Sequence, residues 1–245
     1  MNDGVVRIAM WSGPRNISTA LLRAWENRAD TLVCDEPLYA HYLSVTAREH
    51  PGSDEVIAAG DTDWTRVVGR LVEGPTGGKT VFYQKHMGHH LLPHMGRDWL
   101  LRLENALLIR DPREMLLSLV RNLPDPRIED TGLPQQVEVL DLVRRETGKT
   151  PPVLDARDVL EHPRRTLELL CDALGVEFSE RMLSWPAGPR PTDGVWAKHW
   201  YREVERSTGF APWKPRTGEL TGEVARLYEE CLPYYRKLAE RRLRA

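Results

Sequence analysis

The chain has 245 residues, of which 41% are hydrophobic and 29% are charged, and its formal net charge is -2. These values are ordinary for a globular protein in water, and the weak net charge argues against a nucleic-acid partner. The three cysteines, Cys34, Cys171 and Cys231, form neither a disulfide framework nor a metal-binding pattern. We find no secretory leader and no apolar run of roughly 18 residues, so we expect a cytoplasmic protein without a membrane partner.

The first element in chain order is an apolar run, Val5 to Trp11, which predicts a strand. Ser12 to Pro14 interrupts this run, and apolar residues recur with helical spacing from Ile17 onward. A strand, a tight loop and a helix in this order point backbone N–H groups and the positive end of the helix dipole at one spot. The stretch therefore predicts an anion-binding site, although an ordinary strand-to-helix turn explains it equally well.

Three side chains add to this predicted anion site. Arg15 supplies a fixed positive charge, and Ser18 and Thr19 supply hydroxyl donors. The loop lacks the Gly-Lys-Ser/Thr ending of a nucleotide-triphosphatase loop. Gly74 to Thr80 is closer to that motif, but it precedes the apolar run Val81 to Tyr83 instead of following a strand. We interpret it as a flexible loop.

The rest of the chain alternates between short apolar runs and helical patterns. Further strands are predicted at Thr31 to Cys34, Thr80 to Gln84, Asn105 to Ile109 and Pro152 to Asp155. Helices are predicted at Asp63 to Val72, from Pro112 onward, and at Gln135 to Glu146, Pro163 to Leu174 and Thr221 to Arg241. We expect an irregular or helical insertion at Tyr39 to Gly60 and a proline- and aromatic-rich lid or loop at about 185–217.

This alternation predicts a single α/β domain over residues 1–245, with a mostly parallel central sheet between two layers of helices. Ligands of such sheets bind at the carboxyl ends of the strands. Polar residues follow four of the predicted strands at these ends, namely Ser12 to Thr19, Asp35-Glu36, Lys85-His86 and Arg110. The sequence therefore predicts that they meet in one site.

A second anion site is predicted where the fourth strand ends. Arg110 follows that strand, and Ser118 lies on the next helix, on the same face as Asp111 and Glu114. An arginine and a hydroxyl that face each other suit a phosphate monoester. The structural alternative is an arginine that pairs locally and a serine that bonds its own helix.

With two predicted phosphate sites, the sequence resembles those of the sulfotransferase superfamily. The donor substrate of that family, 3′-phosphoadenosine 5′-phosphosulfate, carries phosphate at both ends of its ribose. Gly13 to Thr19 resembles the P-loop-like segment that binds the 5′-phosphosulfate in that family, and Arg110 to Ser118 resembles its pattern for the 3′-phosphate. Val153 to Gly175 is similar to the leucine, proline, leucine-cysteine and leucine-glycine stretch of the family. Arg206 to Phe210 resembles its late loop over the 3′-phosphate and adenine.

The resemblance implies a P-loop NTPase-like fold and transfer of a sulfuryl group to a hydroxyl or amine of a small-molecule acceptor, without a metal. Arg15 would also act in catalysis, on the bridging oxygen of the donor. The residues implied to bind the donor are Gly13, Pro14, Arg15, Asn16, Ser18, Thr19, Arg110, Ser118, Arg206 and Gly209.

Two residues compete for the role of the catalytic base that removes the acceptor proton. Glu36, followed by Pro37, resembles the glutamate of the bacterial and carbohydrate-acting branches. His86 resembles the histidine that ends the third strand in the aryl and steroid branches, and its ordinary pKa suits base catalysis near neutral pH. The Asp-Glu-Pro context favours Glu36.

Other functional classes remain open at this point. A kinase-like or non-catalytic adenine-nucleotide binder would share the fold, because a fold does not fix a function. His89, His90 and His94 lack the spacing of a zinc site, so we expect no metal. The expected partner is the acceptor molecule, and the sequence leaves a homodimer open.

Overall fold

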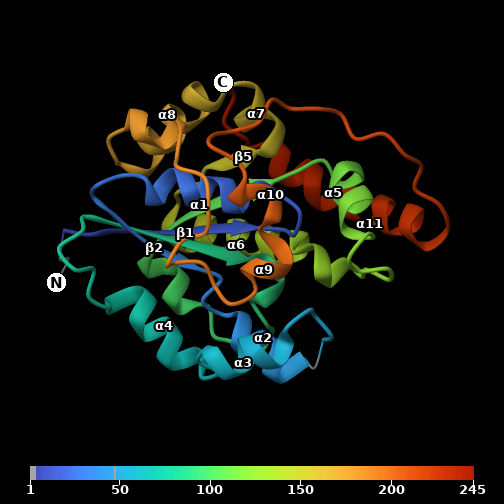
Figure 1. Cartoon of the computed structure of the whole chain (residues 1–245), viewed down its shortest axis with the longest axis horizontal. Helices are drawn as coiled ribbons and strands as arrows, with labels where there is room; N and C mark the ends of the chain where they lie inside the picture. Colours follow the sequence, from blue (N-terminus) through green and yellow to red (C-terminus); the bar gives the residue numbers. More distant parts are fainter. Residues whose placement is uncertain (1–3, 47) are drawn as a thin grey trace.

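The computed structural model describes residues 4–46 and 48–245, and in these residues the centre of the molecule is a parallel sheet of five strands (Figure 1). The strand order is β2-β3-β1-β4-β5, with β1 in the middle. The strands are β1 (Val6–Ser12), β2 (Thr31–Asp35), β3 (Val81–Met87), β4 (Glu104–Ile109) and β5 (Val153–Asp155). This arrangement confirms the predicted α/β fold.

Helices pack on both faces of the sheet, and β1 contributes to both cores because its successive side chains point to opposite faces (Figure 1). Ile8 and Met10 face one core, and Ala9 and Trp11 face the other. The first core is covered by α1 (Ser18–Glu26), α7 (Ala156–Glu161) and α8 (Pro163–Leu174). The second is covered by α4 (Trp64–Glu73), α5 (Pro112–Leu119), α6 (Leu133–Thr147) and α11 (Gly222–Ala239).

Two segments lie outside these layers. The predicted insertion forms α2 (Tyr39–Thr46) and α3 (Ser53–Ala59), whose own small core contains Tyr42, Leu43 and Val56. The predicted lid, residues 185–217, contains the short helices α9 (Ala197–Trp200) and α10 (Arg202–Glu205). The 3-10 helices are η1 (Gly88–His90), η2 (Asp98–Arg102), η3 (Ile128–Thr131) and η4 (Glu180–Leu183). Within the described ranges, none of the helices combines the length and apolar character needed to cross a bilayer.

Aspartates fix several of the turns that lead from a strand or loop into a helix. Asp111 accepts hydrogen bonds from the N–H groups of Arg113 and Glu114, and Pro112 occupies the first turn of α5. Asp155 caps α7 in the same way. These caps fix the chain direction after β4 and β5, so that α5 begins directly beside the carboxyl end of β4.

Candidate functional site

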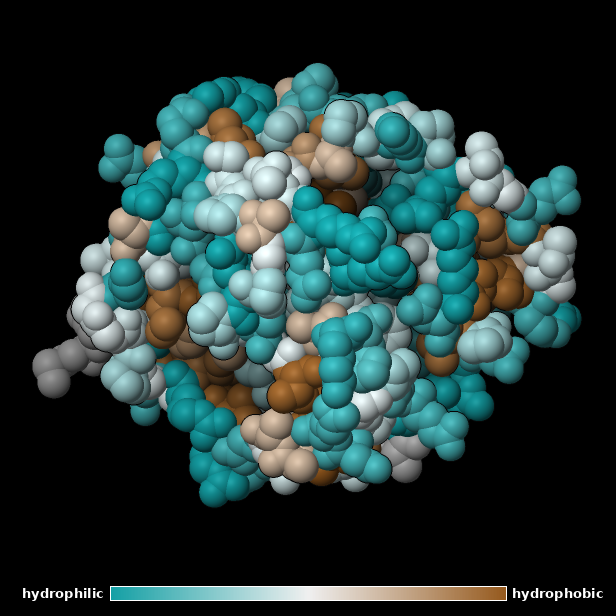
Figure 2. All heavy atoms as spheres, in the orientation of Figure 1, coloured by the Kyte–Doolittle hydropathy of each residue, from teal (hydrophilic) through white to brown (hydrophobic). Residues whose placement is uncertain are grey.

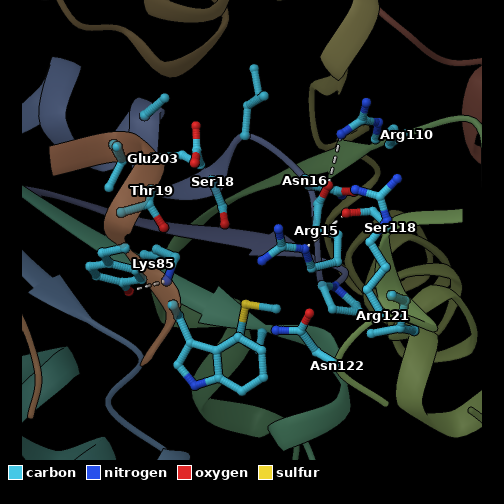
Figure 3. Close-up of a pocket in the computed structure, with 18 of the residues that line it drawn as sticks. Arg15, Asn16, Ser18, Thr19, Lys85, Arg110, Ser118, Arg121, Asn122 and Glu203 are labelled. Carbon is cyan, nitrogen blue, oxygen red and sulfur yellow. Dashed lines mark hydrogen bonds between the residues drawn. The ribbon is translucent and has the colours of Figure 1, made fainter. Parts of the chain in front are cut away.

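A cleft of about 760 Å³ lies at the carboxyl ends of the strands, between the loop after β1, the start of α5 and the lid. Figure 3 shows its side chains, and in Figure 2 hydrophilic residues cover most of the surrounding face. Predicted site residues that line the cleft are Pro14, Arg15, Asn16, Ser18, Thr19, Glu36, Arg110, Ser118 and Gly209. Among the described residues, Gly13, His86 and Arg206 are not part of the lining.

The loop after β1 is packed tightly against its surroundings. A Cβ atom on Gly13 would collide with the carbonyl oxygen of Thr131, so this position requires glycine for close approach of two backbones. Asn16 donates a hydrogen bond from Nδ2 to the carbonyl oxygen of Leu108 on β4, at 3.0 Å. These contacts hold the loop over β4.

The two predicted anion sites are in direct contact. Arg15 has a φ of 57° and donates from Nε to Ser118 Oγ at 3.0 Å. Arg110 donates from Nη1 to the carbonyl oxygen of Arg15 at 2.9 Å (Figure 3). Positive φ is uncommon for residues other than glycine and often marks a functional site. The loop after β1 and the start of α5 therefore form one continuous site.

Four arginines converge at this end of the cleft, Arg15, Arg110, Arg121 and Arg216. Burial lowers the pKa of Arg15 and of Arg216, and the positive charges of Arg110 and Arg121 lower both further. Arg110 is paired, because Glu114 Oε2 accepts from it at 2.8 and 3.0 Å. Arg216 Nε is buried and has no hydrogen-bond partner in the described part of the chain. The arrangement is therefore short of negative charge, as expected for an anion-binding site.

The lid is joined to these arginines through Trp213. The indole Nε1 of Trp213 donates to Glu114 Oε1 at 3.1 Å, while the other oxygen of Glu114 binds Arg110. The guanidinium of Arg157 lies 4.2 Å from the centre of the Trp213 ring. One carboxylate thus connects a cleft arginine with an aromatic side chain of the lid.

A second charged cluster lies across the cleft from Arg110, at the ends of β2 and β3 (Figure 3). The Lys85 ammonium is 1% exposed and donates to Asp35 Oδ1 at 2.8 Å and to Glu36 Oε1 at 2.5 Å. Burial alone would lower the pKa of Lys85, but the two carboxylates raise it well above its ordinary value. Burial raises the pKa of Glu36, and the positive charge of Lys85 opposes this effect. Glu36 has a φ of 43°.

The predicted strand Thr80 to Gln84 is too short, because β3 continues to Met87 and contains Lys85 and His86. Side chains alternate along a strand, so these two neighbours point to opposite faces of the sheet. His86 stacks on Trp11 at 4.4 Å between ring centres, and its Nε2 donates to Gln84 Oε1 at 3.2 Å. Burial, and then the charge of Lys85, lowers the pKa of His86 to about 3. Of the two candidate bases, Glu36 lines the cleft.

The other predicted histidines are divided between two places. His89 and His90 line the cleft, whereas His94 contacts His41, with 2.9 Å between the two Nε2 atoms. In residues 4–46 and 48–245, no group of three histidine, cysteine or carboxylate side chains is arranged to hold a metal ion.

The residues of the cleft that sequence reasoning missed include Arg121, Tyr201 and Arg216. Arg206, which was predicted to bind the donor, is exposed on the surface of the lid. Arg216 lies in a Lys-Pro-Arg-Thr-Gly stretch, and Gly218, two residues later, has a φ of 141°. An arginine two or three residues before a glycine in a late loop was the available signal for both arginines. The fold of the lid places Arg216 in the cleft and Arg206 on the surface.

Comparison with known proteins places these features in a family. The family model of the sulfotransferase domain matches residues 6–242. Two curated relatives from Arabidopsis thaliana, branched-chain-amino-acid aminotransferase-like proteins 1 and 2, are 38% and 36% identical over 231 residues. The matches cover 93% of this chain and 40% of each relative, so the chain spans about two fifths of the curated relatives' length.

Two solved structures share the fold. The sulfotransferase domain from the curacin biosynthetic pathway is 16% identical, with a TM-score of 0.56 over 92% of this chain and 97% of that chain. A sulfotransferase from Alicyclobacillus acidocaldarius is 14% identical, with a TM-score of 0.53 over 97% of both chains. At these identities the similarity concerns the fold, and the chemistry has to be argued from the cleft.

Proposed function

This chain belongs to the sulfotransferase domain family, and from that premise we propose that it transfers a sulfuryl group from 3′-phosphoadenosine 5′-phosphosulfate to a hydroxyl or amine of a small-molecule acceptor. The observation that carries the proposal is the convergence of the four arginines on one end of the cleft, where they outnumber the carboxylates of Glu114 and Glu203. An anion with several charges balances such a group of guanidinium ions.

The residues at this end fit a donor with two phosphate-bearing arms. The first turn of α1 has no side-chain cap, so its N–H groups, with the hydroxyls of Ser18 and Thr19, suit the 5′-phosphosulfate. Arg110 and Ser118, at the start of α5, suit the 3′-phosphate. Arg15 lies between the two groups because its side chain bonds Ser118 and its backbone begins the turn into α1.

The acceptor would approach from the side of Glu36. During transfer the acceptor oxygen or nitrogen bonds to sulfur, the bond from sulfur to the phosphate oxygen breaks, and the acceptor proton moves to Glu36. Arg15 would stabilise the negative charge that develops on the leaving phosphate. The raised pKa of Glu36 brings its basicity closer to neutral pH, which favours base catalysis.

A thermal-shift experiment with 3′-phosphoadenosine 5′-phosphate tests the donor assignment. Saturation at about 100 times the dissociation constant stabilises a protein by about 2.7 kcal/mol, so a clear rise in Tm is expected. AMP, which lacks the 3′-phosphate, should shift Tm much less because Arg110 and Ser118 would have nothing to bind. Equal shifts from both nucleotides would contradict the proposal, and a larger shift from ATP with magnesium would favour a kinase-like protein.

Sulfuryl transfer itself requires an acceptor screen. Phenols, sugars and amines should be incubated with donor labelled in its sulfuryl group, and labelled product should appear with at least one class. The alternative of a non-catalytic nucleotide binder would be supported if the 3′-phosphorylated nucleotide binds tightly while every acceptor class stays unlabelled.

A further inference from the structure

One side chain of the lid reaches into the charged cluster that contains the proposed base. The hydroxyl of Tyr201 donates to Asp35 Oδ2 at 2.6 Å and accepts from Lys85 Nζ at 2.9 Å. It also accepts from Trp196 Nε1, a second lid residue, at 3.1 Å. Tyr201 is 4% exposed, so this contact is shielded from water. The lid and the ends of β2 and β3 are therefore joined through one phenol oxygen.

The hydrogen bonds of this cluster fix the position of the lysine. The three N–H bonds of the Lys85 ammonium go to Asp35, Glu36 and Tyr201, which leaves the ammonium no donor to spare. Tyr201 has one proton to donate, and that proton goes to Asp35. The ammonium is consequently held at one point between the two carboxylates.

The two carboxylates of the cluster differ in their hydrogen bonds and in their access to the cleft. Both oxygens of Asp35 are occupied, Oδ1 by Lys85 and Oδ2 by Tyr201, and Asp35 is not part of the cleft lining in the described chain. Glu36 shares Oε1 with Lys85, and its side chain lines the cleft. When Lys85 is positive and both carboxylates are ionised, the cluster has a net charge of one negative unit. Uptake of a single proton neutralises the cluster.

We propose that Tyr201 is a positioning residue for the base: its hydroxyl occupies Asp35 and orients Lys85, so that the acceptor proton is taken by Glu36, and only when the lid is in place. The proposal rests on the proposed role of Glu36. Since Tyr201 belongs to the lid, movement of the lid away from the cleft would remove a donor from Asp35 and an acceptor from Lys85. Base catalysis and closure of the cleft are thereby coupled.

The effect on pH dependence follows from the groups that face Glu36. These are Asp35, Lys85, Tyr201 and the phenol of Tyr39. Burial and Asp35 raise the pKa of Glu36, whereas Lys85 and the neighbouring Tyr201 hydroxyl lower it. Removing the Tyr201 hydroxyl should therefore raise the pKa of Glu36 and move the acidic limb of the rate profile to higher pH.

The test compares Tyr201→Phe with Tyr235→Phe. Tyr235 also donates to an aspartate, Asp155 Oδ2, at 2.8 Å, and neither of these residues lines the cleft. Both variants lose one tyrosine–aspartate hydrogen bond, and Tyr201→Phe also removes the acceptor of Lys85 and Trp196, so both should lose stability and Tyr201→Phe should lose more. Only Tyr201→Phe should lower kcat, by about 10- to 100-fold, with the acidic limb at higher pH and the affinity for the 3′,5′-bisphosphate nucleotide unchanged.

A second measurement separates this proposal from the proposed function. The titration of Glu36, followed by NMR in protein labelled with ¹³C at its carboxyl groups, should move to higher pH in Tyr201→Phe and stay unchanged in Tyr235→Phe. This result would support the positioning role even if no acceptor were sulfurylated. Wild-type kinetics and an unshifted Glu36 titration in Tyr201→Phe would overturn it, while sulfuryl transfer by the wild type would still stand. If Tyr201→Phe fails to fold, Trp196→Phe should show the same changes at smaller size.

Discussion

The two ends of the cleft are built on opposite electrostatic principles. At the proposed donor end, Arg15, Arg110, Arg121 and Arg216 outnumber the two nearby carboxylates, Glu114 and Glu203. At the base end, Lys85 is enclosed by Asp35, Glu36 and Tyr201, and every N–H bond of the ammonium has a partner. The first group is short of negative charge, and the second is internally satisfied.

This difference indicates which part of the site is complete before ligand binds. Repulsion among guanidinium ions is relieved when an anion enters, so part of the binding energy of a donor comes from removing that repulsion. The base end needs no ligand for its geometry, because buried charges that are paired and hydrogen-bonded hold a fixed arrangement. We infer that the donor completes one end, while the protein itself completes the other.

The largest expected effect tests the base end. Glu36→Gln keeps the size of the side chain but loses its basicity, so turnover should fall by about 10² to 10⁴ while donor affinity stays near wild type. The wild-type rate should rise with pH through the raised pKa of Glu36 and level off above it. Stopped assays with labelled donor over a pH series measure both quantities.

His86→Asn is the matched control for this prediction, because His86 lies beneath the cleft against Trp11. Its loss should cost stability and leave most of the turnover. Turnover that depends on His86 and not on Glu36 would mean that the base end is not the catalytic end.

The next largest effect tests the donor end. Arg216→Ala should weaken binding of 3′-phosphoadenosine 5′-phosphate by about 10- to 100-fold, since a hydrogen bond to a charged group contributes about 1.5 to 3 kcal/mol. The same substitution should raise the Tm of the ligand-free protein, because it removes one of the mutually repelling charges. Calorimetric titration and thermal unfolding give the two values.

Arg206→Ala serves as the comparison for the donor end, because its side chain is exposed and lies outside the cleft lining. It should leave both the affinity and the Tm close to wild type. An Arg206→Ala variant that loses nucleotide binding while Arg216→Ala keeps it would reverse the assignment of the two arginines.

The smallest effect concerns the neutral histidines beside the base end. Burial lowers the pKa of His89 to about 3, so the unfolded chain gains a proton near pH 6.5 that the folded chain gains only at much lower pH. Stability should therefore decrease as pH falls from about 6.5, by about 1.4 kcal/mol per pH unit for this histidine. His89→Gln should reduce the slope of stability against pH, measured by urea unfolding. His199→Gln, which replaces an exposed histidine, is the control, and an equal change of slope in both variants would refute the neutral state of His89 in the folded protein.

The sequence was sufficient for elements whose ends are marked locally. The helix predicted at Pro163 to Leu174 matches α8 residue for residue, because a proline begins it and Gly175, with a φ of 67°, ends it. Arg15 and Arg110 were also predicted to share a site, since each follows a strand whose carboxyl end lies at the same edge of the sheet, and Ser118 was predicted to face that edge from the next helix.

The sequence was insufficient where a side chain depends on distant partners. The predicted third strand stopped at Gln84, yet β3 continues through the buried Lys85, since Asp35 at the end of β2 and Glu36 directly after it neutralise the charge of the lysine. Tyr201 gave no local signal, because its role depends on the path of the lid across the cleft. Patterns along the chain indicate local turns and periodicity. They do not indicate the contacts of Lys85 and Tyr201, because these join residues that are distant in the sequence.

Trp213 gives the molecule an optical property. Its indole shares Glu114 with Arg110, so an anion that draws Arg110 away from Glu114 changes the electric field at the indole ring. Indole emission responds to such fields, whereas Trp11 and Trp25 are fully buried in the two cores and are insulated from the cleft. Of the eight tryptophans of the chain, Trp213 is therefore placed to convert occupancy of the arginine site into a change of fluorescence, without any added dye.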